Sequence, residues 1–215
     1  QNDTVRVSWY SEAHGPWSLL IAPLKIMASV IGAISVESPR LDAFLSSDET
    51  LLNTFAYTGA FTCYAIDGGA QSTTTVDLSK TYCDWARRNL LHNGISEGAQ
   101  HRVLQQDCLP FLEEEARNRA RYDLIVCDPP TFSASKRMAQ NSFAVNRDHA
   151  ALIGQCIQIL TIDGVLYFST NSRRFQLAEN ELPSNLTIEE ISQRTVPEDF
   201  RNSRIHRCWR LTRTH

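Results

Sequence analysis

The chain has 215 residues, of which 42% are hydrophobic and 21% charged, as expected for one globular domain with a sizeable core. Its formal net charge of −3 excludes a globally basic nucleic-acid-binding protein, so phosphates would have to meet a local basic patch. Six scattered cysteines without a C-x-x-C pair form neither a disulfide framework nor a zinc site. We therefore expect no metal and a cytoplasmic, reducing setting.

The first 46 residues are predicted to form an irregular and shortened N-terminal extension, ahead of a domain over residues 47–215. Residues 17–36 are mostly apolar and about as long as a membrane span. Pro23 and Lys25 lie in the middle of this stretch, where a span tolerates them poorly. We predict a buried strand-and-helix piece there, and no membrane contact.

From residue 51 onward, strand patterns alternate with amphipathic helical patterns. The strands are predicted over 51–56, 72–76, 101–105, 124–127, 165–169, 186–190 and 208–212, with a turn at Asp163-Gly164. Four helices are predicted. The first runs from Ala60 to Ile66, and the second from the Ser79 cap to Asn93-Gly94. The third begins at about Pro110, and the fourth has an apolar face that ends at Leu160. This alternation predicts an α/β fold, a seven-stranded and mostly parallel sheet with helices on both faces.

The helix near Pro110 has a marked charge order. Glu113, Glu114 and Glu115 are predicted at its start, and Arg117, Arg119 and Arg121 at its end. Such an order would complement the helix dipole, so we interpret these residues as a solvated helix face.

Polar residues follow successive predicted strands, where ligands bind in open α/β sheets. Gly59 permits close backbone approach, Asp77 offers a carboxylate to two ribose hydroxyls, and Asp107 offers an acceptor to an adenine amino group. The full set of predicted cofactor-binding residues is Asn53, Tyr57, Thr58, Gly59, Asp77, Leu78, Asp107, Cys108 and Asp128.

The first turn also decides between cofactors. A dinucleotide fold would place G-x-G-x-x-G there, but this turn contains Gly59 alone. A cofactor without phosphates fits better, and we predict S-adenosylmethionine.

The run Asp128-Pro129-Pro130-Thr131-Phe132 ends the fourth strand with an acid, two stiff residues and an aromatic ring. This turn suits a planar base held against a reactive cofactor. The predicted catalytic residues are Asp128, Pro129, Pro130, Phe132 and Asn171. An ordinary Asp-Pro turn is the plainer interpretation of the same run.

Residues 51–94 and 122–150, with DPPTFS and SKRM, and the tail QRTVPEDFRNSRIHRCWRLT resemble class I S-adenosylmethionine-dependent RNA methyltransferases, above all the RlmK-like guanine-N7 group. The resemblance implies a cytoplasmic Rossmann-like enzyme acting on 23S rRNA or a precursor particle. It implies that Tyr57, Gly59, Asp77, Asp107 and Asp128 line the cofactor pocket and that 128–132 faces the base.

The chain departs from that family at residues 36–50, which lack an element of the form D-T-G-x-F-L-D-x-R; residues 41–44 are a remnant of it. No partner methylase domain or RNA-binding module precedes this stretch, so we expect one in a full-length context. The departure keeps open a non-catalytic RNA- or protein-binding module.

The positions of the cysteines help to predict which base atom is methylated. Cytosine C5 needs a cysteine nucleophile, which the cytosine relatives carry after the fifth strand, where this chain has Ser169-Thr170-Asn171. Guanine N7 has a lone pair and no proton, so holding it close to the methyl group of the cofactor is enough for transfer. We predict N7, and the alternative is another RNA base atom, either cytosine C5 or an exocyclic amine. Basic residues after the site are predicted to bind RNA, namely Lys136, Arg137, Arg147, Arg173, Arg174 and Arg204.

Overall fold

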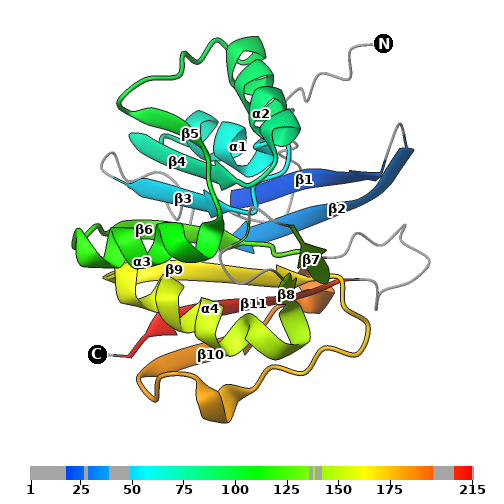
Figure 1. The fold of residues 1–215 in the computed structure, drawn as a ribbon, viewed down its shortest axis with the longest axis vertical. Helices are drawn as coiled ribbons and strands as arrows, with labels where there is room; N and C mark the ends of the chain where they lie inside the picture. The colour runs from blue at the N-terminus through cyan, green and yellow to red at the C-terminus, as the bar shows by residue number, and fades with distance from the viewer. Residues whose placement is uncertain are drawn as a thin grey trace.

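A seven-stranded sheet organises the chain (Figure 1). The computed structural model describes residues 18–26, 29–38, 49–135, 138, 142–195 and 206–214, with side chains from residue 49 onward. The strands are β3 (Thr50–Thr54), β4 (Ser72–Asp77), β5 (His101–Gln105), β6 (Tyr122–Cys127), β9 (Leu160–Thr170), β10 (Leu186–Glu190) and β11 (Arg207–Arg213). Their order is β10-β11-β9-β6-β3-β4-β5, and within this sheet β11 runs opposite to the other six strands.

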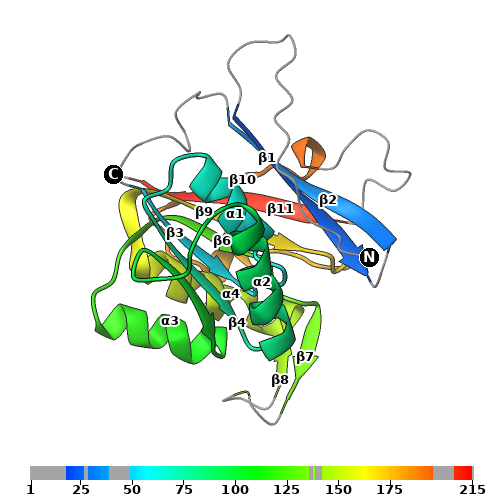
Figure 2. The same ribbon diagram turned by 90° about the horizontal axis from the view of Figure 1, so that it is seen from above.

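Helices cover both faces of this sheet, as predicted. They are α1 (Ala60–Asp67), α2 (Lys80–His92), α3 (Cys108–Arg117) and α4 (Val145–Ile159), with short 3₁₀ turns η1 (Glu179–Glu181) and η2 (Ser192–Arg194). The consecutive residues Leu51 and Leu52 are both buried but belong to different apolar clusters, one containing α1 and one containing α3 and α4. Figure 2 shows α1 and α2 on one side of the strands and α3 with α4 on the other.

The predicted turn at Asp163-Gly164 is wrong. These residues lie inside β9, which begins at Leu160, five residues before the predicted start. The pairing of β9 with β6 is irregular between Tyr122 and Leu124, so the strand continues through the glycine at a bulge.

The charge order predicted for α3 is also wrong. The helix begins at Cys108 with Asp107 as its cap, so its first turn contains no acidic residue. Glu113 to Glu115 lie in its second half, and of the three arginines only Arg117 lies in the last turn. Capping by Asp107 moves the helix start ahead of Pro110.

The front of the chain contains β1 (Ser18–Ile26) and β2 (Ser29–Ser38), which pair antiparallel. The predicted strand-and-helix piece is therefore two strands. The predicted boundary between residues 46 and 47 lies outside the described residues, as does the remnant at 41–44. Over the described part of the chain, no helix is both long and apolar enough to cross a membrane.

A second hairpin follows β6. It consists of β7 (Phe132–Ala134) and β8 (Ser142–Ala144), with Phe132 opposite Ala144. It continues directly into α4, and the backbone N–H of Val145 donates to the carbonyl of Thr131 at 3.1 Å. This bond fixes the hairpin next to the carboxyl end of β6.

Candidate active site

The turn after β3 has an unusual backbone. Phe55, Tyr57 and Gly59 all have positive φ, at 53°, 50° and 69°. The amide of Gly59 donates to the carbonyl of Ala56 at 2.8 Å, which closes the turn. A Cβ on Gly59 would lie 2.8 Å from the Cβ of Ala86 in α2. Glycine is therefore required both by the backbone conformation and by the close approach of α2.

Asp77 at the end of β4 holds this turn from the next strand. Its carboxylate accepts from the amide of Tyr57 at 3.0 Å and from the amide of Ser79 at 2.8 Å. Burial raises the pKa of Asp77, and these two backbone donors oppose the shift. A carboxylate has about four acceptor positions, so Asp77 keeps capacity for the hydroxyls of a ligand.

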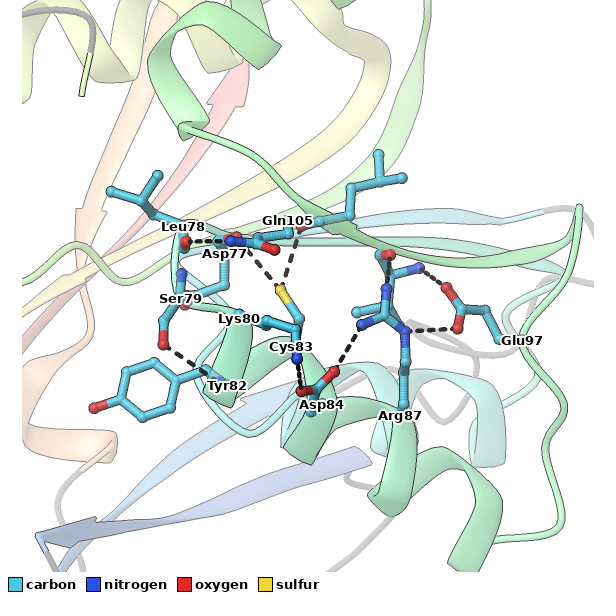
Figure 3. Close-up of polar contacts among 12 residues, drawn as sticks. Asp77, Leu78, Ser79, Lys80, Tyr82, Cys83, Asp84, Arg87, Glu97 and Gln105 are labelled. Atoms are coloured by element: carbon cyan, nitrogen blue, oxygen red, sulfur yellow. Dashed lines mark hydrogen bonds and ion pairs between the residues drawn. The ribbon is translucent and has the colours of Figure 1, made fainter. Parts of the chain in front are cut away.

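Figure 3 shows Asp77 and Ser79 leading into α2. The Ser79 hydroxyl accepts from the Tyr82 amide at 3.4 Å and caps the helix, as predicted. The Cys83 thiol donates to the carbonyl of Asp77 at 3.4 Å and so ties the first turn of α2 to the end of β4. The position of Asp77 is thus set by β4 and α2 together.

The next strand end adds Asp107 and its neighbour. Asp107 is half-buried, and its carboxylate accepts from the amide of Leu109 at 3.3 Å. The Cys108 thiol is buried and accepts from the amide of Phe55 at 3.3 Å. Leu78 is half-buried and packs against the core. The side chain of Cys108 therefore supports the first turn, while Asp107 lies at the edge of the sheet.

Two other predicted cofactor residues have internal partners. Asn53 is 1% exposed and donates to the Thr62 hydroxyl at 3.1 Å, beneath α1. The carbonyl of Thr58 accepts from the Asn89 side chain at 2.9 Å. Both residues hold the first turn against α1 and α2, and direct cofactor contact by their side chains stays a prediction.

Asp128 follows β6 directly and lies beside the end of β9. The Ser169 hydroxyl donates to its carboxylate at 2.6 Å. Burial raises the pKa of Asp128, and nearby His206 opposes this shift. Pro129 is buried and Pro130 is exposed, so the chain runs from the sheet toward solvent here. The proline rings restrict the backbone of this turn.

Phe132 is 63% exposed at the start of β7, an unusual state for a phenylalanine. Its hairpin is fixed from below by Phe143, which is fully buried and faces Phe55 with ring centroids 5.8 Å apart. The exposed ring is therefore carried by an anchored element. No local sequence pattern indicates this role of Phe143.

Other predicted residues surround this edge. Asn171, Arg173 and Arg174 are exposed just after β9. Arg147 is exposed near the start of α4, where its guanidinium donates to Asp148 at 2.6 Å. The remaining predicted RNA contacts, Lys136, Arg137 and Arg204, lie outside the described residues.

Two polar neighbours of Asp128, Ser169 and His206, are not among the predicted site residues. His206 is 3% exposed, and among the residues that the structure describes neither of its ring nitrogens has a hydrogen-bond partner. By contrast, both ring nitrogens of His149 are bonded, to the Val145 carbonyl and the Ala178 amide. Within the described ranges, no cluster of His, Cys, Asp or Glu could hold a metal ion.

The strand order with one reversed strand is that of class I methyltransferases. Two solved structures have a similar fold. A SAM-dependent methyltransferase from Agrobacterium tumefaciens matches with a TM-score of 0.65 and 19% identity over 100% of this chain and 76% of that one. A methyltransferase complexed with SAH matches with a TM-score of 0.64 and 21% identity over 94% and 57%. The domain is thus a class I methyltransferase fold.

The family model described as Conserved hypothetical protein 95 matches residues 41–180, and the chain belongs to that family. Its similar relatives include the ribosomal RNA large subunit methyltransferase K/L of Methylococcus capsulatus, 51% identical over 78% of this chain and 22% of the relative. The large subunit methyltransferase K of Neisseria meningitidis is 45% identical over 77% and 46%. The predicted resemblance is confirmed, and the chain spans less than half of either relative.

Proposed function

We propose that this chain transfers a methyl group from S-adenosylmethionine to a base of large-subunit ribosomal RNA, with guanine N7 as the acceptor atom. The observation that carries the proposal is the placement of Asp77 and Asp128 along one sheet edge, beside the exposed ring of Phe132. The rRNA methyltransferase relatives support the substrate class. We further propose a cytoplasmic protein with a second methyltransferase or RNA-binding domain in its full-length form.

The cofactor half comprises the ends of β3, β4 and β5. Asp77 would accept from the ribose hydroxyls, and Asp107 would lie near the adenine amino group. The turn at Gly59 is tight and lacks the further glycines of a pyrophosphate loop, which suits a ligand without phosphates. When bound, S-adenosylmethionine supplies an electrophilic methyl group on a sulfonium. The chain's part is to fix the direction of that group.

The acceptor half comprises the ends of β6 and β9. Phe132 would stack on a base turned out of its RNA helix, and Asp128 would accept from an N–H on its edge. Asn171 and the arginines after β9 would contact the base and the phosphates. Guanine N7 carries an in-plane lone pair and no proton. Alignment would therefore be enough, and no side chain has to remove a proton.

The state of the cysteines supports N7 over cytosine C5. Addition to the cytosine ring requires an accessible thiolate. All six cysteines are buried. Burial raises the pKa of Cys108 and Cys208, which disfavours their thiolates. An exocyclic amine is the second candidate, because the Asp128 carboxylate could accept from an amino group.

The first test is calorimetric titration of the chain with S-adenosylmethionine and S-adenosylhomocysteine. Micromolar binding, followed by transfer of labelled methyl to rRNA from a strain lacking this gene, would support the proposal. Mass spectrometry of the digested nucleosides then separates N7-methylguanine from a methylated amine or 5-methylcytosine. Absence of binding at millimolar cofactor would favour the non-catalytic RNA- or protein-binding module.

A further inference from the structure

Three polar side chains meet where β6, β9 and β11 lie side by side. Asp128 follows β6, Ser169 is near the end of β9, and His206 directly precedes β11. Because β11 runs antiparallel to β9, with Arg207 opposite Thr170, its first residues lie at the edge where the parallel strands end. Reversal of one strand thus brings the chain's tail to the acceptor half of the site.

Strand alternation places these side chains on one face of the sheet. Val126 and Cys208 both belong to the apolar cluster that contains α1. Asp128 lies two residues after Val126, and His206 lies two residues before Cys208, so both share that face. Both side chains therefore lie on that face, at the edge of the sheet where β6 and β9 end and β11 begins.

Asp128 and Ser169 are hydrogen-bonded to each other, whereas His206 is not bonded to either. Ser169 donates to the Asp128 carboxylate at 2.6 Å. His206 is 3% exposed, and over the described part of the chain both its ring nitrogens lack a hydrogen-bond partner. Because Ser169 donates to the acid and not to the imidazole, the set is no Ser-His-Asp nucleophile. An imidazole buried without partners is costly, so a polar group supplied from outside the free chain is expected to pair with it.

We propose that His206 is a specificity-determining residue for the methyl acceptor, binding the polar edge of the same base whose N–H is accepted by Asp128. The inference rests on the proposed function and deepens it. Nucleobase edges present donors and acceptors side by side, and a neutral imidazole offers one of each. One contact leaves a stacked base free to rotate in its plane. A second contact fixes the rotation and so selects the atom that meets the methyl group.

The test compares two variants in the full chain. His206→Phe keeps a ring of similar size without hydrogen bonding, and His206→Gln keeps a donor and an acceptor. Turnover is measured with labelled S-adenosylmethionine and rRNA from the deletion strain, cofactor affinity by calorimetry, and folding by thermal denaturation. We expect His206→Phe to lower kcat/KM for RNA roughly 10- to 100-fold, with cofactor affinity unchanged. His206→Gln should recover most of the loss. His92→Phe, on the exposed end of α2, is the matched control.

A double-mutant cycle tests whether the two residues hold one base. If they do, Asp128→Asn combined with His206→Phe should lose less than the product of the single losses. Multiplicative losses would count against the inference. So would a His206→Phe enzyme within threefold of the wild type.

A purely structural role predicts a different pattern. Parallel losses of stability, cofactor affinity and turnover in both variants would overturn the inference. If His206→Phe does not fold, His206→Leu replaces it, and failure of both to fold also assigns a structural role. A wild-type chain that binds cofactor but methylates no rRNA overturns the proposed function and this inference together. An active wild type with an equally active His206→Phe overturns the inference alone.

Discussion

Phe143 of β8 packs against Phe55 in the turn after β3, with their ring centroids 5.8 Å apart. The amide of the same Phe55 donates to the Cys108 thiol at 3.3 Å. The hairpin that presents Phe132 is therefore fastened to the turn on the cofactor half of the site. A substitution at this contact should therefore affect both the cofactor half and the acceptor half of the site.

Phe143→Ala should lower the free energy of unfolding by about 3–5 kcal/mol, because it removes a buried ring and leaves a cavity. The control is Phe132→Ala in the same hairpin, whose exposed side chain should cost no more than about 0.5 kcal/mol. Denaturant unfolding of the two variants measures the difference. Equal effects would show that Phe143 does not anchor the hairpin.

Gly59→Ala and Gly94→Ala form a second matched pair. Both glycines have positive φ, at 69° and 74°, but a Cβ on Gly94 meets no atom of the described residues within 4 Å. Gly94→Ala should cost about 1–2 kcal/mol from the left-handed backbone alone. Gly59→Ala should cost a further 1–3 kcal/mol or so, because its Cβ is forced against Ala86, and should also weaken cofactor binding. Similar losses of stability in the two variants would mean that α2 moves away from the added Cβ at no cost in free energy.

Local signals account for the parts of the fold that the sequence predicted. Ser79 caps α2 and Asn93 ends it, as expected from capping chemistry within a few residues. The strands at His101–Gln105 and Leu186–Glu190 have their predicted bounds, since β-branched and apolar runs are bounded by turns. Each of these features depends on residues that are close together in the sequence.

Long-range pairing explains what was missed. Ser169 and Asp128 are 41 residues apart, and their bond depends on β9 lying next to β6. His206 reaches the site only because β11 is reversed. Asn53 is predicted to contact the cofactor, and within β3 its side chain donates to Thr62 of α1, which local patterns do not indicate. A shift of one residue in a strand changes the face that a side chain occupies, and local patterns do not fix it that closely.

Asp77→Ala should weaken binding of S-adenosylmethionine by about 1.5–3 kcal/mol, as expected for lost charge-assisted hydrogen bonds. Asp77→Asn keeps only one acceptor oxygen, so it loses the bond from either the Tyr57 or the Ser79 amide together with the charge. Thermal denaturation of both Asp77 variants therefore separates damage to the turn from loss of the ribose contact. Asp84→Asn, which removes two exposed ion pairs on α2, is the control and should change affinity little. Calorimetry gives all three values, and unchanged affinity in a folded Asp77→Ala would exclude the ribose role.

Phe132→Ala should reduce methyl transfer to RNA by roughly 5- to 150-fold, the range expected for one lost base-aromatic stack. Cofactor affinity should stay nearly unchanged, since the ring lies on the acceptor side. Ile162→Ala removes another exposed apolar side chain, from the bulged part of β9, and should have no effect on transfer. Equal losses of cofactor binding and transfer in Phe132→Ala would contradict a stacking role.

Asp148 provides a test by pH. Its hydrogen bonds from Arg147 hold the pKa of its carboxyl below the usual range. The unfolded chain therefore takes up this proton at higher pH than the folded chain, so the stabilisation is present above about pH 4 and is lost as the pH falls through the folded-state pKa. Asp148→Asn should lower the free energy of unfolding by about 1 kcal/mol at pH 7, because the Arg147 partner is largely exposed.

The difference between this variant and the wild type should shrink steadily below about pH 4, where the wild-type carboxyl is protonated as well. Denaturant unfolding at pH 7, 5 and 3 measures it. Asp67→Asn at the exposed end of α1 controls for the loss of one negative charge. A gap that persists at pH 3 would mean that the effect of the substitution does not come from the charge of Asp148.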